Sequence, residues 1–80
     1  MESPSQLLTT QEQVQQNMKH LAAKLREARY RQWISQAELA DGTGLTQSVI
    51  ARLEAGKSNP TLKTLLTVVA ALGVELVVTD

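Results

Sequence analysis

The most informative segment of the chain is SQAELADGTGLTQSVIARLEAG, residues 35–56. Ser35 and Glu38 stand at the spacing of a capping box, in which each side chain binds the other residue's backbone N–H, so a helix should run over residues 36–43. Gly44 should end that helix, because glycine enters the left-handed backbone conformation without steric cost.

A second helix should begin after Thr46, a suitable N-cap, and should stop at Gly56. Ala40 in the first helix is small enough to let the second helix cross closely over it. The apolar residues that we expect to fix this crossing are Leu39, Leu45, Ile50 and Leu53. Two helices joined in this way by a tight glycine turn form a helix-turn-helix, whose second helix enters the major groove of DNA.

Apolar residues at helical spacing predict further helices on both sides of this motif. The stripe before it predicts a helix from about Gln11 to Arg31 and consists of Val14, Met18, Leu21, Leu25 and Ala28. The stripe after it predicts a helix that opens at Pro60, with Asn59 or Thr61 as cap, and ends at Gly73. Its members are Leu62, Leu65, Leu66, Val69 and Leu72.

The C-terminal segment has the composition of a β-strand, since it is rich in β-branched residues. It is the only strand candidate, and a single strand leaves its backbone groups unpaired. We therefore expect it to pair with the same strand of a second copy through Val74, Leu76, Val77 and Val78. The alternative is a frayed tail without regular structure.

These elements predict an all-α fold, a compact bundle of four to five helices that contains a helix-turn-helix and carries a short C-terminal strand pairing across a dimer. Residues 1–9, which contain Pro4 and lack periodicity, are expected to form a flexible N-terminal arm. Residues 10–73 would form the DNA-binding domain, and residues 74–80 the dimerisation strand.

Composition and charge narrow the classes of function. The 80 residues include no cysteine and a single histidine, so we expect neither a disulfide nor a metal site, and no cofactor. The net charge is zero, but all eight basic residues and four of the acidic ones lie between Lys19 and Lys63, which gives that stretch a charge of +4. A basic segment between acidic ends can bind phosphates locally.

The sequence also lacks the signals of membrane insertion and secretion. No apolar run has the length needed to span a bilayer, and the first residues lack the pattern of a signal peptide. We therefore expect a cytoplasmic protein without a membrane partner.

The second helix of the motif has a polar face that could read DNA. At 100° per residue, Ala55 and four other residues fall within an arc of about 140°. The four are Gln47, Ser48, Ala51 and Arg52. Glutamine can bind adenine bidentately, arginine can bind guanine, and alanines allow close approach to a groove. Thr46 and the first backbone amides of this helix can bind a phosphate.

No residue constellation predicts an enzyme. No serine, cysteine or pair of carboxylates stands with a matching histidine for nucleophilic or acid–base chemistry, and no glycine-rich phosphate loop is present. We therefore assign no catalytic residue.

Several separately spaced motifs resemble those of the lambda-repressor-like, or XRE-type, transcription regulators. They are ISQAELA at 34–40, TGLTQSVI at 43–50, LEAGK at 53–57 and NPTL at 59–62. The resemblance implies that Gln36 contacts a phosphate, and that Lys57, Ser58 and Asn59 grip the DNA backbone. It also implies a structural ion pair between an arginine of the first helix and the glutamate of the LEAGK stretch, here Arg29 and Glu54.

Trp33 departs from the family pattern, which often has a small turn residue there, and we expect it in the core or at a dimer surface.

Two functions follow from these features. The first is a transcriptional regulator, a repressor that binds a palindromic operator in double-stranded DNA as a homodimer. The second is an antitoxin that binds a toxin protein and regulates its own operon, because residues 72–78 (LGVELVV) resemble the tail of HipB-like antitoxins.

Overall fold

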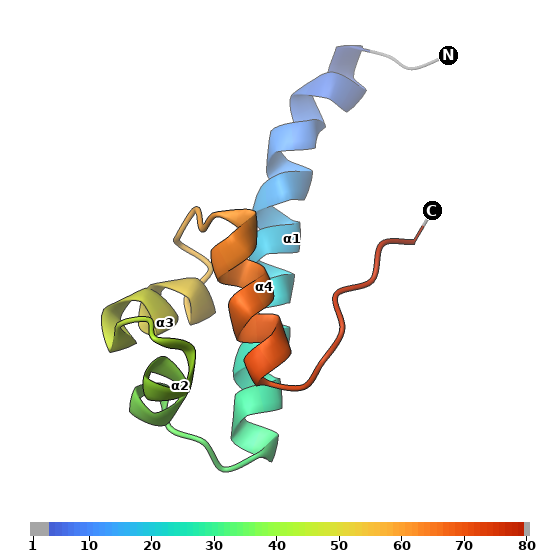
Figure 1. The fold of residues 1–80 in the computed structure, drawn as a ribbon. Coiled ribbons are helices and arrows are strands. Elements are labelled where there is room, and N and C mark those ends of the chain that lie inside the picture. Colours follow the sequence, from blue (N-terminus) through green and yellow to red (C-terminus); the bar gives the residue numbers. More distant parts are fainter. Residues whose placement is uncertain (1–3, 80) are drawn as a thin grey trace.

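The computed structural model describes the backbone of residues 4–79 and the side chains of residues 10–79. These residues form four helices and no strand: α1 (Pro4–Arg31), α2 (Gln36–Thr43), α3 (Gln47–Glu54) and α4 (Leu62–Ala71) (Figure 1). The predicted all-helical class is therefore confirmed for the described part of the chain.

Helix α1 begins at Pro4, well before the start near Gln11 that the sequence predicted. Residues 4–9 of the predicted N-terminal arm thus have a helical backbone, while residues 1–3 lie outside the described part. Proline suits the first helical position, because its fixed φ is already helical and an N–H there would have no partner inside the helix. Figure 1 shows the N-terminal half of α1 standing clear of the other helices, and its side chains over residues 10–17 are all exposed.

Local capping sets the starts of the three shorter helices. The Ser35 hydroxyl accepts from the Glu38 N–H, and the Glu38 carboxylate accepts from the Ser35 N–H, both at 3.0 Å, so the predicted capping box is confirmed. The Ser35 N–H also lowers the pKa of Glu38, because it stabilises the ionised carboxylate. Thr46 caps α3, and Thr61 is the residue that caps α4.

The core lies where α1, α2, α3 and α4 meet. Its centre is Ile50 of α3 and Val68 of α4, the largest fully buried side chains. Around them lie Leu25, Ala28, Leu39, Ala40, Leu53, Val69 and Leu72. The small Ala40 is buried at the place where α2 meets α3, as the sequence predicted, and the crossing of these two helices is thus part of the central core.

Three helices end in the same hydrogen-bonded turn. In α3 and α4 the residue with positive φ is a glycine, Gly56 (φ 70°) and Gly73 (φ 69°). In α1 that position is held by Trp33, with φ 59°. A side chain in this left-handed conformation costs about 1–2 kcal/mol relative to the right-handed one, a strain that glycine avoids.

Trp33 is also 92% exposed, so its predicted place in the core is wrong. Its neighbour Ile34 is the residue that packs against the core cluster instead. The turn at the end of α1 therefore directs one of two adjacent apolar residues inward and the other outward.

The predicted C-terminal strand is not formed, because residues 74–79 belong to no helix or strand in the described chain. A strand needs a neighbouring strand to bind its backbone groups, and one copy of this chain supplies none. The segment leaves the lower end of α4 (Figure 1), and its apolar side chains Val74, Leu76, Val77 and Val78 are exposed.

Gly56 should be more sensitive to substitution than Gly44. Both have positive φ, but an added Cβ at Gly56 would lie 3.3 Å from the Cα of Lys19 in α1, whereas Gly44 faces open space. We expect Gly44→Ala to lower the free energy of unfolding by about 1 kcal/mol and Gly56→Ala by about 2–3 kcal/mol. Urea unfolding followed by circular dichroism would measure both; equal losses would contradict the close approach of α3 to α1.

Candidate nucleic-acid interface

Helices α2 and α3 and the turn between them form the helix-turn-helix. Gly44 ends α2 with φ 74°, and the Thr46 hydroxyl then accepts from the Val49 N–H at 3.2 Å to start α3. Ile50 and Leu53 bury one side of α3 against the rest of the core. The opposite side of α3 is thereby left without cover from the chain.

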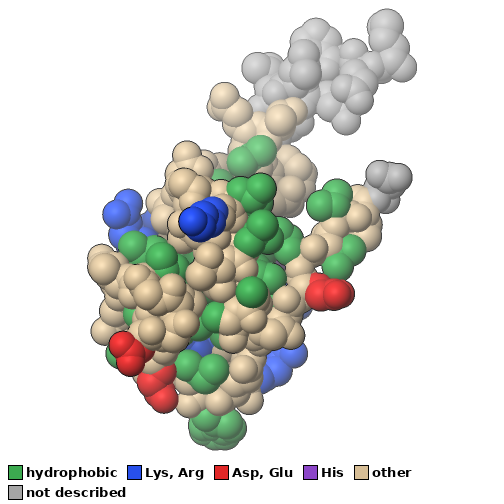
Figure 2. Space-filling model, viewed as in Figure 1, with side chains coloured by type: hydrophobic (Ala, Val, Ile, Leu, Met, Phe, Trp, Pro, Cys, Tyr) green, Lys and Arg blue, Asp and Glu red, His purple; other side chains and the backbone are tan. Residues whose placement is uncertain are grey.

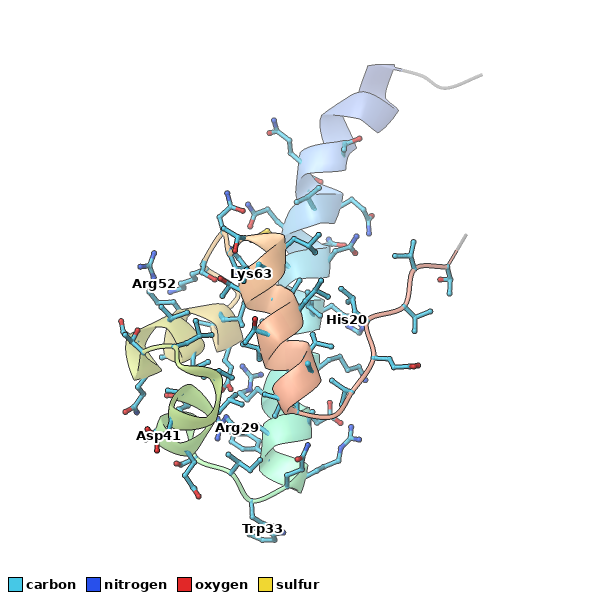
Figure 3. All side chains as sticks on the ribbon, in the orientation of Figure 1. His20, Arg29, Trp33, Asp41, Arg52 and Lys63 are labelled. Atoms are coloured by element: carbon cyan, nitrogen blue, oxygen red, sulfur yellow. The ribbon has the colours of Figure 1, made fainter. Side chains whose placement is uncertain are left out.

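The residues on this uncovered side are those predicted to read bases. Gln47, Ser48 and Arg52 are exposed, and Ala51 is half-buried between them. We call these four residues the recognition face; Figure 3 shows Arg52 pointing outward from it. Val49, which precedes the buried Ile50, is 37% exposed.

Four of the five predicted phosphate contacts border the recognition face. Thr46 is exposed at the start of α3, and Lys57 and Asn59 are exposed in the loop after it. Ser58 is half-buried, and with Asn59 and Arg52 it lines a shallow hollow between α3 and the start of α4. The structure thus brings polar side chains from both ends of α3 to the same side of the molecule.

The fifth predicted phosphate contact, Gln36, is partly engaged inside the protein. Its Nε2 donates to a carboxylate oxygen of Glu54 at 3.2 Å, and the residue is half-buried. No spacing in the sequence indicates this contact, because the two residues lie on different helices. One amide hydrogen and the carbonyl oxygen of Gln36 remain available to a ligand.

Glu54 is the centre of a buried polar cluster behind the recognition face. Arg29 of α1 donates to both carboxylate oxygens at 2.7 Å, and the two side chains are only 7% and 4% exposed. The hydrogen bond to Glu54 is the main cause that raises the pKa of Arg29. Arg29 also donates to the Ile34 carbonyl at 2.8 Å, and Arg26 donates to the Glu54 carbonyl at 2.9 Å. This cluster links the end of α3 to α1 and to the turn before α2.

Charged side chains are distributed unevenly around these elements. Figure 2 shows basic side chains over α3 and the start of α4 and acidic side chains over α2; Figure 3 labels Arg52, Lys63 and Asp41 in those places. Among the residues that the structure describes, no group of three His, Cys, Asp or Glu side chains could hold a metal ion. Within the same part of the chain, no helix has the length and hydropathy required to cross a membrane.

Comparison with known proteins agrees with this geometry. The helix-turn-helix family model HTH_3 matches residues 24–78, which include the recognition face, the bordering loop and the buried cluster. The chain belongs to this helix-turn-helix family.

Curated relatives carry the HTH domain within longer proteins. An uncharacterised HTH-type transcriptional regulator of Sinorhizobium fredii, y4dL, is 45% identical over 58 residues, which are 72% of this chain and 30% of that protein. An uncharacterised HTH-type transcriptional regulator of Haemophilus influenzae is 43% identical over 53 residues, 66% of this chain and 54% of that protein. The chain thus spans about half or less of the length of these relatives.

A solved HTH structure has a similar fold over most of both chains. The restriction-modification controller protein C.AhdI of Aeromonas hydrophila is 31% identical, with a TM-score of 0.70 over 76% of this chain and 88% of its own. The XRE-type resemblance drawn from the sequence is therefore confirmed.

Removing one member of the buried ion pair should destabilise this HTH domain strongly. Glu54→Leu would leave the Arg29 charge buried without its partner, and we expect a loss of about 3–5 kcal/mol in the free energy of unfolding. The double variant Arg29→Met/Glu54→Leu should recover much of that loss, since it buries no charge. Chemical denaturation would measure both variants.

Glu27→Ala is the matched control. Glu27 binds Arg31 at 3.0 Å, but both side chains are more than half exposed, so its removal should change stability by less than about 0.5 kcal/mol. A double variant as unstable as Glu54→Leu alone would mean that packing, rather than an unpaired charge, sets the effect.

Proposed function

We propose that this protein is a transcriptional repressor that binds a palindromic DNA site as a homodimer, with α3 of each copy in the major groove. The observation that carries the proposal is the uncovered recognition face on a helix-turn-helix. In such motifs the second helix presents its early residues to base edges while the flanking segments hold the backbone.

The recognition face has the chemistry for direct readout. Gln47, in the first turn of α3, would bind the N6 and N7 positions of an adenine, and Arg52 would bind guanine O6 and N7. Ser48 would add a less selective hydrogen bond. Ala51 is small and half-buried, so it would let the helix backbone approach the groove closely.

The bordering residues would hold the DNA backbone and set the register of α3. Thr46 and Gln36 stand at the starts of α3 and α2, where unpaired N–H groups favour an anion. Lys57, Ser58 and Asn59 follow the other end of α3. Contacts from both sides of the recognition face would fix its orientation without reading sequence themselves.

A second copy would bind on the apolar surface formed by α4 and the C-terminal segment. Leu62 and Leu66 of α4 are 67% and 44% exposed, and Leu66 lines a hollow together with Val74, Leu76 and Val77. Burying this surface against the same surface of another copy would remove it from water. The tails would then have a partner strand, and the two-fold axis would match a palindromic site.

The base-reading role is tested by comparing Gln47→Ala with Lys57→Ala on a site obtained by sequencing DNA fragments selected by the purified protein. We expect Gln47→Ala to weaken binding to that site by about 1–3 kcal/mol while binding to random DNA is nearly unchanged. Lys57→Ala should weaken binding to both DNAs and reduce the slope of log affinity against log salt concentration by about one.

Fluorescence anisotropy of labelled duplexes at several salt concentrations would supply these numbers. An equal loss on random DNA for Gln47→Ala would remove Gln47 from the base-reading set. Failure of the wild-type protein to select any duplex would refute the proposed function as a whole.

The dimer is tested by deleting residues 74–80. We expect the truncated chain to sediment as a monomer in analytical ultracentrifugation and to bind its palindromic site much more weakly, because the two half-sites are then bound independently. Val14→Ser, which changes an exposed residue on the projecting half of α1, is the control and should leave the dimer intact. A truncated chain that stays dimeric would place the interface elsewhere.

A further inference from the structure

Trp33 is the one tryptophan of the sequence, and none of the surfaces described so far uses it. Its side chain is 92% exposed, and Figure 3 shows it pointing away from the body of the molecule at the turn after α1. An exposed indole at a fixed position is a candidate contact for a binding partner, because tryptophan combines a large apolar ring with an N–H donor.

The turn that holds Trp33 is built like those at the ends of α3 and α4. The Trp33 N–H donates to the Tyr30 carbonyl at 3.0 Å and the Ile34 N–H to the Arg29 carbonyl at 3.3 Å, which is the Schellman pattern. The same pattern surrounds Gly56 and Gly73, where the chain uses glycine. Tryptophan is therefore strained at a position that the fold alone would give to glycine.

This turn is fixed relative to the recognition helix. Arg29 donates both to the carbonyl of Ile34, the residue after Trp33, and to the carboxylate of Glu54 at the end of α3. Ser35, the N-cap of α2, follows directly, and Gln36 is among the proposed phosphate contacts. Trp33 thus stands at the outer edge of the proposed DNA-binding side, beyond the start of α2.

The surroundings of Trp33 favour DNA over a second protein surface. Its neighbours in the chain include Gln32 and Arg31, both exposed, with Arg31 paired to Glu27 at 3.0 Å, and Tyr30 is a nearby exposed aromatic residue. Gln32 donates to the Leu72 carbonyl at 2.7 Å, so the start of the C-terminal segment lies beside this turn, but Trp33 does not line the apolar hollow of α4 and that segment. An isolated ring in a polar setting, two residues before the N-cap of α2, suits a sugar–phosphate chain better than an apolar protein patch.

We propose that Trp33 contacts the DNA backbone at the outer edge of each half-site, with its ring against a deoxyribose and its indole N–H donating to a phosphate oxygen. This inference rests on the proposed DNA-binding function. The contact extends the footprint of the protein beyond the major groove and carries no base preference, because sugars and phosphates are common to all sequences.

The fluorescence of this single tryptophan tests the contact directly. Adding duplex DNA should change the Trp33 emission and reduce its quenching by acrylamide, in step with the anisotropy of labelled DNA, whereas diluting the protein alone should not. DNA that binds by anisotropy but leaves Trp33 emission and quenching unchanged would overturn the proposal and leave the DNA-binding function intact. Emission that changes with protein concentration alone would assign Trp33 to a protein interface instead. No binding by anisotropy would refute both proposals.

Two substitutions separate a DNA contact from a structural role. Trp33→Gly and Trp33→Asn both suit a positive φ, so each variant should have a melting temperature equal to or above that of the wild type. Each should nevertheless bind specific and random duplexes about 3- to 10-fold more weakly per bound protomer, the range expected for one lost hydrogen bond. Gln16→Ala, exposed on the projecting half of α1, is the control and should leave affinity unchanged. Variants that fold and keep wild-type affinity would overturn the proposal.

Discussion

The buried pair of Arg29 and Glu54 is the interaction on which the arrangement of the domain depends. A carboxylate and a guanidinium lose their hydration when they are buried, and the loss is offset only where the geometry is good and the remaining donors and acceptors are bound. Here the pair is bidentate, and Arg29 donates a third N–H to the Ile34 carbonyl. No buried side-chain nitrogen or oxygen in the described chain lacks a partner. The pair therefore specifies one position of α3 relative to α1.

The same pair connects the recognition helix to the two segments that would flank it on DNA. Gln36 reaches Glu54 from the start of α2, and the Ile34 carbonyl reaches Arg29 from the turn before it. If α3 moved, these hydrogen bonds would break, or Gln36 and Ile34 would have to move with it. These contacts thus hold the recognition face and the start of α2 together, and on DNA they would keep the spacing between the base contacts and the phosphate contacts constant.

Local chemistry predicted the bounds of α2 and α3, whereas the polar contacts between helices followed only from the family resemblance, as for Arg29 and Glu54, or were missed. The capping box at Ser35, the cap at Thr46 and the glycine turn at Gly44 act within a few residues, so the bounds of α2 and α3 followed from them. The position of Gln36 against Glu54 arises from tertiary packing, and nothing in the spacing of the two residues indicates it. The tail has a strand-like composition but forms no strand in a single copy, because a strand needs a partner for its backbone groups.

Zero net charge is compatible with DNA binding because the charges are not equally available. Arg29 and Glu54 cancel inside the protein, and Lys24 and Arg31 lie beside Glu27 on α1. Among the described residues, Arg52 and Lys57 belong to no ion pair, and both are exposed next to the recognition face. Asp41 lies on α2 in the same shallow hollow as Gln47, so a phosphate would be repelled from that hollow. The proposed phosphate contact on the α2 side is made instead by Gln36, at the start of that helix. The exposed charges of this small domain thus favour a polyanion beside Arg52 and Lys57 and oppose one at the hollow that holds Asp41, a constraint on docking orientation that net charge does not reveal.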